Sequence, residues 1–218
     1  MNDALINING GNVQTLQIIV MLTLVSLIPS LLIMTTSFTR IIIVLSIFRN
    51  ALGLQQTPPN MVLVSIALFL SLFIMGPVID EIDQTAYQPY VAQQITAEQA
   101  ATLAQTPLKE FMLKQTKTDS LNMFLEFANI TEPENETDLP LRVIIPAFMA
   151  SELSRAFVMG FLLYIPFLVI DVIVASTLMS MGMIMLPPVM ISLPFKILLF
   201  VIVNGWDMLF MTLVKSFN

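Results

Sequence analysis

The chain has 218 residues and a net charge of −6, with 56% hydrophobic and only 11% charged residues and a mean hydropathy of +0.85. This composition is far more apolar than that of a soluble domain and indicates a membrane protein, while the negative charge argues against nucleic acid as a partner. Cysteine and histidine are both absent, which excludes disulfides, zinc sites built on these side chains, and catalysis by a histidine base or a cysteine nucleophile.

A polar lead at residues 1–13 comes before the first apolar segment. It has no clear secretory signal, because Asp3 stands where a basic residue is usual and no small-residue cleavage site follows a short apolar core. We therefore expect either a naturally short form or a mature product.

Two apolar runs, Leu16–Met34 and Met61–Ile79, have the length of about 20 residues that a membrane-spanning helix needs. We expect them to form a first helical hairpin over residues 14–79. Arg40 and Arg49 lie between the two runs and bracket a short apolar stretch. By the positive-inside rule they predict a cytoplasmic loop, with the N-terminus and the acidic segment after the second run on the outer side.

Residues 80–142 carry 11 of the 15 acidic and 4 of the 9 basic residues, so we expect a separate, acidic, extracytoplasmic insert. Thr96 followed by Gln99 is a capping pattern that predicts the start of a helix. Further along, apolar residues recur at helical spacing. Phe111 and Phe124 fall on this rhythm and are too large to leave exposed. We expect them either in an internal core of the insert or in contacts between subunits.

The second pair of apolar runs, Ala156–Met179 and Val189–Leu213, predicts a second helical hairpin over residues 143–218. An amphipathic helix from Pro140 to Arg155 is expected to lead into it. The sequence therefore predicts an all-α protein of two membrane-associated helical hairpins that flank a helical insert.

Three charges interrupt the second hairpin: Asp171 in its first run, and Lys196 and Asp207 in its second. Ionisable groups within a membrane are costly and are usually paired. They are expected either to form a proton path or an ion pair between subunits, or to mark helix ends and positions outside the lipid.

Glu152 and Arg155 are three residues apart, a spacing that allows them to pair on one face of a helix. They are also candidates for ion pairs with Lys117 or Arg142 of a neighbouring copy. Such pairs would set the register between subunits more than the affinity.

Each hairpin contains a similar elbow. Gly53 precedes Pro58-Pro59, and Gly182 precedes Pro187-Pro188 at the same spacing. Repeated hairpins are familiar in membrane proteins, so the echo is either a real duplication of architecture or a chance match.

The second elbow is rich in methionine, with Met179, Met181, Met183, Met185 and Met190 in one short stretch. Alternation at period two does not make a helical stripe, so a bent or extended loop with several sulfurs on one side is predicted. Methionine is long and polarizable, so copies of this loop around an axis could close an irregular opening and still yield to varied surfaces. The alternative is ordinary packing, since methionine is common in apolar helices.

Long stretches of the chain also match one family in order. They are TSFTRIIIVLSIFRNALG (36–53), QQTPPN (55–60), SMGMIMLPP (180–188), LPFK (193–196) and the GW pair at 205–206. These collinear motifs resemble the FliP family, the export-gate proteins of flagellar type III secretion, which have relatives in virulence secretion systems. The resemblance covers roughly residues 14–217.

The resemblance implies a structural, non-enzymatic pore subunit without a cofactor, placed in the bacterial inner membrane at the flagellar basal body. It implies five copies that join FliQ-like and FliR-like components, with FlhB-like and FlhA-like export proteins as further partners and unfolded flagellar proteins as cargo. It also implies that many helices stand above the bilayer plane, covered by other subunits. The family has a methionine-rich pore loop, which assigns Met181, Met183, Ile184 and Met185 to the pore; Ile184 replaces the middle one of three consecutive methionines.

A proton-coupled or small-solute transporter is the alternative, supported by Asp171, Asp207, Lys196 and the repeated hairpin. An intramembrane aspartyl hydrolase is excluded because the sequence has no GxGD motif. Stoichiometry separates the first two hypotheses: a gate subunit needs several copies and other membrane proteins, whereas a transporter should bind its solute as a monomer or a dimer.

Overall fold

The computed structural model describes residues 5–8, 11–130, 135–183 and 185–217. Within them the chain is almost entirely helical, which confirms the expected all-α fold. A short antiparallel pair within the polar lead, β1 (Leu5–Ile8) and β2 (Gly11–Gln14), is an addition that the sequence pattern did not predict. The main helices are α1 (Thr15–Thr35), α2 (Phe38–Ala51), α3 (Asn60–Ile82), α5 (Ala97–Gln115), α6 (Thr118–Ala128), α7 (Leu141–Ser180), α8 (Pro188–Ile202) and α9 (Gly205–Lys215).

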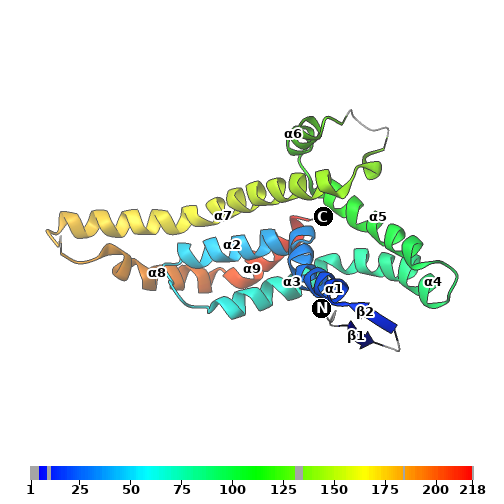
Figure 1. Cartoon of the computed structure of the whole chain (residues 1–218). Helices are drawn as coiled ribbons and strands as arrows, with labels where there is room; N and C mark the ends of the chain where they lie inside the picture. The colour runs from blue at the N-terminus through cyan, green and yellow to red at the C-terminus, as the bar shows by residue number, and fades with distance from the viewer. Residues whose placement is uncertain (1–4, 9–10, 131–134, 184, 218) are drawn as a thin grey trace.

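Short helical pieces complete the chain: a π-helical turn at Asp83–Tyr87, α4 (Gln88–Val91) and a 3₁₀ turn at Glu136–Asp138. In Figure 1, α7 extends from the region below α6 to the far left of the molecule. The insert helices α5 and α6 lie at its beginning, and the connection to α8 lies at its far end. The acidic insert and the methionine-rich elbow therefore lie at opposite ends of α7.

Two helical stretches are long and apolar enough to cross a membrane, Asn60–Val91 and α7. Two bent pairs would raise the number of spans among the described residues to four if each pair is one span: α1 with α2, bent by 70°, and α8 with α9, bent by 67°. At about 1.5 Å per residue, the 40-residue α7 is about twice as long as a hydrocarbon core is thick. Part of α7 must therefore lie outside the lipid or tilt strongly.

The apolar runs of the second hairpin differ from the helices that the structure shows. α7 continues through Pro146 and Pro166, so the expected amphipathic segment and the third apolar run are one helix. The fourth run is divided instead, because Asn204 adopts a left-handed conformation with φ of 50° and ends α8. Gly205 follows, and a Cβ there would lie 1.9 Å from the Phe200 ring, so only glycine fits this sharp break.

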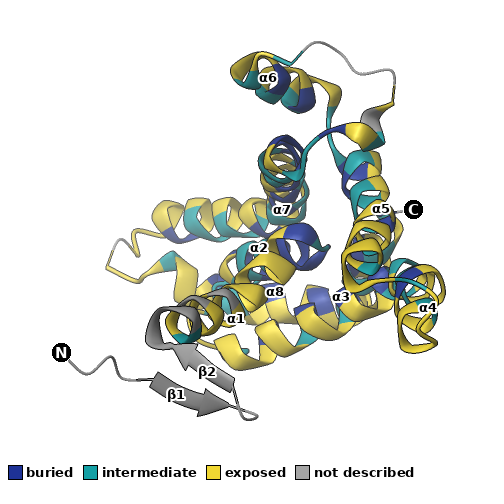
Figure 2. Ribbon diagram, turned by 45° about the vertical axis from the view of Figure 1, so that its right-hand side comes forward, coloured by how far each residue is buried: buried dark blue, intermediate teal, exposed yellow. Residues whose placement is uncertain are grey.

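The main core surrounds α2, which is packed against α3 and α7 (Figure 2). The Phe48 ring lies at its centre, with its centroid 4.9 Å from that of Phe200 and 5.9 Å from those of Phe167 and Trp206. At Gly160 the crossing of α7 over α2 is so close that a Cβ would lie 2.5 Å from Ile47. The short apolar stretch between the two arginines is therefore the central buried helix.

A second core joins the insert to the beginning of α7. It consists of insert residues packed against the first turns of that helix: Met112, Leu121, Leu125, Leu139, Val143, Ile144, Ala147 and Phe148. The boundary expected near residue 142 thus falls inside one packed cluster. The capping box predicted at Thr96 and Gln99 is present and starts α5.

Candidate functional site

The methionine-rich connection between α7 and α8 begins with a defined turn. Gly182 has φ of 75°, the Met183 amide donates to the Leu178 carbonyl at 3.0 Å, and the Gly182 amide donates to that of Met179 at 3.1 Å. This is the Schellman arrangement that ends a helix with a left-handed glycine. Pro187 then stands immediately before the first residue of α8, where a proline needs no helical partner.

Methionine side chains of this connection are exposed. Met185 is 98% exposed, Met181 66% and Met183 41%, and Met179 and Met190 at the flanking helix ends are also exposed. Ile184 lies outside the described residues. None of the five methionines is buried, so they do not belong to the core of the isolated subunit.

Lys196 and Asp171 meet behind this connection. Lys196 Nζ donates to Asp171 Oδ2 at 2.7 Å and to the Ala51 carbonyl at 3.0 Å, while Ser192 Oγ donates to Asp171 Oδ1 at 2.5 Å. Lys196 is only 2% exposed and Asp171 is 23% exposed. We call Ala51, Asp171, Ser192 and Lys196 the Lys196 node; it joins α2, α7 and α8. The ammonium group lies at the carbonyl end of α2, where the helix dipole favours a cation.

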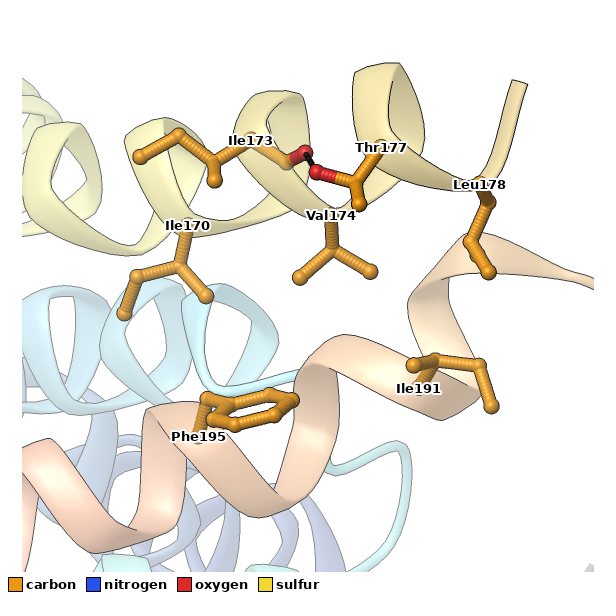
Figure 3. Close-up of a pocket in the computed structure, with 7 residues that line it drawn as sticks. All are labelled: Ile170, Ile173, Val174, Thr177, Leu178, Ile191 and Phe195. Atoms are coloured by element: carbon orange, nitrogen blue, oxygen red, sulfur yellow. Dashed lines mark hydrogen bonds between the residues drawn. The ribbon is translucent and has the colours of Figure 1, made fainter. Parts of the chain in front are cut away.

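An apolar cavity of about 460 Å³ lies between α7 and α8. Figure 3 shows its lining side chains pointing into the space between the two helices: Ile170, Ile173, Val174, Thr177, Leu178, Ile191 and Phe195. The Thr177 hydroxyl donates to the Ile173 carbonyl of its own helix at 2.8 Å. The cavity therefore offers a ligand no free polar group that would hold it in one orientation.

A second polar cluster lies near the beginning of α7. Arg40 of α2 is 1% exposed and forms a two-pronged ion pair with Glu152 of α7, in which Nε donates to Oε2 at 2.9 Å and Nη2 donates to Oε1. Nη1 donates to the Ser216 carbonyl at 2.8 Å, and the guanidinium lies 3.7 Å from the centre of the Phe217 ring. Because one end of the chain closes over the arginine, this pair is shielded from solvent.

The insert is tied to the same cluster. Gln115 at the end of α5 accepts a hydrogen bond from Arg40 at 3.1 Å and another from Arg155 at 2.9 Å, and its amide donates to the Phe217 carbonyl at 2.9 Å. Arg40, Gln115, Glu152, Arg155 and the C-terminal pair Ser216–Phe217 form what we call the Arg40 cluster. It fixes the insert against the membrane-associated helices.

The remaining sequence-predicted charges lie in different places. Glu152 pairs with Arg40 instead of Arg155, although the spacing allowed the helical pair. Lys117 donates from its amide to Ser151 at 2.9 Å and from Nζ to Ser154 at 2.7 Å, so it also faces α7. Arg142 and Asp207 are exposed, and neither forms an ion pair within the described part of the chain.

Phe111 and Phe124 both pack within the chain. The Phe111 ring lies 6.1 Å from that of Phe148 and is stacked at 6.3 Å on that of Phe217, and Phe124 packs against the insert core. Both side chains are half-buried, which leaves part of each available to another subunit.

Sequence reasoning did not identify Arg40, Gln115 or Ser192 as members of these clusters. Arg40 is interpreted above as a topology signal, yet a lone arginine beside a mostly apolar stretch is also the pattern of a buried charge that needs a partner. Nothing in the sequence points to Gln115 or Ser192, because their importance comes from contacts made over long distances in the chain. No cluster suited to a metal ion occurs in the described ranges.

Comparison with known proteins gives a consistent result. The pattern of the FliP family matches residues 21–213. The "Flagellar biosynthetic protein FliP" of Aquifex aeolicus is 49% identical over 211 residues, which is 96% of this chain and 88% of that protein. The proteins of the same name from Bacillus subtilis and Caulobacter vibrioides are 51% and 48% identical and cover 93% and 100% of the chain, and the chain in turn covers 92% and 84% of them.

Proposed function

The chain belongs to the FliP family and is a non-enzymatic membrane component of the flagellar export apparatus in the inner membrane, and we propose that it forms the protein-conducting pore of that apparatus. The methionine-rich connection between α7 and α8 lines the narrowest point of the pore. Its residues Met181, Met183, Ile184 and Met185 form a soft ring around the exported chain.

Exposure of the methionines supports this proposal most directly. A long apolar side chain that is 98% exposed, as Met185 is, stabilises nothing in the isolated subunit. Backbone hydrogen bonds fix the turn at Gly182, so Met181 and Met183 are held on a defined turn. Exposed thioethers held in this way are what a ring of copies needs to close against small solutes and to yield to an unfolded protein.

Several copies are required to form such a ring, and the helical surfaces provide for them. Phe69 and Phe73 on α3 are each 70% exposed, and Phe157 and Phe161 on α7 are exposed too. Large apolar patches of this kind mark contacts with protein or lipid. The family resemblance gives five copies around one axis, joined by FliQ-like and FliR-like subunits, with FlhB-like and FlhA-like proteins beside them.

Charged and aromatic side chains both contribute to the assembly under this proposal. Glu152 and Arg155 belong to the Arg40 cluster, Lys117 donates to α7, and Arg142 is exposed at the beginning of that helix. The outward-facing members of this group set the register between copies. Phe111 and Phe124 add apolar contacts from the insert to the next copy.

Transport of a small solute finds less support in the geometry. Asp171 and Lys196, the charges that favoured it, are bonded to each other, and Lys196 is buried. The cavity between α7 and α8 is lined by apolar side chains except for Thr177, whose hydroxyl already donates to the Ile173 carbonyl. A solute carrier needs a few convergent polar groups that fix its ligand, and the described residues do not bring such groups together there.

The pore proposal is tested by replacing methionines of the proposed ring with a smaller side chain. Met183→Ala with Met185→Ala should raise ion leakage across the membrane of cells that express the complete apparatus, while export of flagellar subunits continues. The matched control is Met61→Ala with Met208→Ala, which removes two exposed methionines from other surfaces of the same chain. Leakage equal to that of the unmodified protein, in a complex that assembles normally, would return the methionines to a packing role and defeat the proposal.

A further inference from the structure

The buried face of α8 is unusual because it is mostly polar. Its three buried side chains are Ser192, Lys196 and Phe200, which form one row at positions i, i+4 and i+8. Many apolar residues of the same helix, among them Phe195 and Val201, are exposed, whereas Phe200 packs in the main core. Hydrogen bonds and an ion pair therefore hold the turn of α8 from Ser192 to Lys196 against α7 and α2.

These polar contacts fix the position of α8 along α7 more strictly than apolar contacts would. Apolar contacts are non-directional, so an apolar helix face can slide along its neighbour at small cost. A buried charge with one matching partner has only one good position, and buried polar groups are best established as devices that fix register. Lys196 has two partners on two other helices, Asp171 on α7 and the Ala51 carbonyl of α2, and Ser192 holds the second oxygen of Asp171.

The Lys196 node lies on the two helices that the methionine-rich connection joins. Asp171 precedes that connection on α7, while Ser192 and Lys196 follow it on α8. Any shift of α8 along α7 would thus move the connection along the same direction. On the connection side, the apolar cavity separates the two helices (Figure 3). Leu178, the last buried residue of α7, lines this cavity together with Ile191 of α8.

We propose that the Lys196 node is the positioning site of the pore loop, and that the cavity beyond it leaves the tip of the α7–α8 hairpin free to bend. This inference rests on the proposed pore function. Asp171, Ser192 and Lys196 act as positioning residues: they set the level at which the methionine ring closes. The cavity supplies the empty volume into which the two helix ends move when a bulky segment of cargo passes.

The decisive experiment compares a single with a double substitution. Lys196→Met leaves the partly buried Asp171 carboxylate without its cation, so the subunit should lose stability and the pore should leak. In the double variant Asp171→Leu/Lys196→Met no charge remains unpaired, so the melting temperature of the assembled complex should recover. Because the register is then no longer specified, leakage should stay high. Lys196→Arg keeps the cation and should stay close to the unmodified protein in both measurements.

The position of the loop can be read directly because the chain has no cysteine. Met185→Cys gives each copy one thiol, and a short bifunctional thiol reagent will link copies only where their loops meet at one level. Cross-linking should be lost when the Asp171→Leu/Lys196→Met pair is added to Met185→Cys, and retained with Lys196→Arg. A double variant with recovered stability, normal leakage and normal cross-linking would overturn the positioning role and leave the node as an ordinary stabilising contact.

The cavity is tested separately with Val174→Phe, which fills the space between the helices. Export of a cargo that carries a bulky side-chain label should fall, whereas export of the unlabelled cargo should continue and the melting temperature should not drop. Equal export of both cargoes would overturn the flexible-tip part of the inference. The pore proposal and the node inference fail on different results. If Met183→Ala with Met185→Ala leaks and the node variants do not, the node inference fails while the pore proposal stands.

Discussion

The two glycine–proline elbows begin with the same helix-ending turn but have different surroundings. In the first, Gly53 has φ of 79° and the Leu54 amide donates to the Arg49 carbonyl at 3.3 Å. In the second, Gly182 has φ of 75°, and the equivalent bond joins Met183 to Leu178 at 3.0 Å. Each helix therefore ends in the same kind of Schellman turn.

The surroundings of the two turns differ completely. A Cβ on Gly53 would lie 3.6 Å from Leu193 and 3.9 Å from Val189, so the first elbow is seated against α8. A Cβ on Gly182 would meet nothing within 4 Å. Arg49 also binds the first elbow, donating to the Pro58 carbonyl at 3.2 Å and to Asn60 Oδ1 at 2.6 Å. The first elbow is packed within the subunit, whereas the turn of the second is open to contacts with other subunits.

The largest loss of stability is expected when the hydrogen bonds that hold the first elbow in place are removed. Arg49→Met deletes two hydrogen bonds from a charged donor, each worth about 1.5–3 kcal/mol, although it also removes a buried Nε that has no partner among the described atoms. We expect a net loss of about 2 kcal/mol in the free energy of unfolding. Denaturation of the detergent-extracted protein measures it.

Two further variants complete this first comparison. Both hydrogen bonds come from Nη1 of Arg49. Arg49→Lys keeps a charged donor on a shorter side chain without the planar guanidinium, so its loss of stability should be smaller than that of Arg49→Met. Met185→Ala at the second elbow should leave the unfolding free energy unchanged. An equal loss at both elbows would contradict the distinction between a seated and a free turn.

The glycines themselves should behave alike, and this sharpens the comparison. Left-handed backbone costs an ordinary L-residue about 1–2 kcal/mol. Gly53→Ala and Gly182→Ala should therefore lower the unfolding free energy by similar amounts, because the added methyl meets only ordinary contacts or open space. Gly53→Asn and Gly182→Asn should recover part of the loss, since asparagine tolerates this conformation. A much larger cost at Gly53 would show that its neighbours, and not its backbone, determine the requirement.

Much of this fold follows from local pattern in the sequence. The apolar runs, the Thr96 capping box and both elbows were predictable because each depends on residues close together in the chain. The broken end of α8 was not predicted. There, Asn204 and Gly205 interrupt an apolar run, and a close approach of the Phe200 ring requires the glycine. That requirement comes from packing and has no periodicity.

The charges show the limit of sequence reasoning most clearly. The spacing of Glu152 and Arg155 suggested a pair on one helix, but Arg40 offers Glu152 two donors in a fixed fork, which is a better match for a buried carboxylate. The partner lies far away in the chain, so no local rule could select it. Asp171 and Lys196 were correctly singled out as charges that need an explanation, yet only the structure shows that they bind each other and the end of α2.

The smallest effect is expected at Ile184, which lies between Met183 and Met185 in the free elbow. Isoleucine and methionine have similar volumes, and swaps that conserve volume cost little even in packed cores. Ile184→Met should therefore leave ion leakage and export of flagellar subunits unchanged. Ile184→Ala is the matched control: it shrinks the ring at the same position and should raise leakage. If Ile184→Met leaks as much as Ile184→Ala, a branched side chain is required there, and closure depends on a fixed shape and not on soft, adaptable side chains.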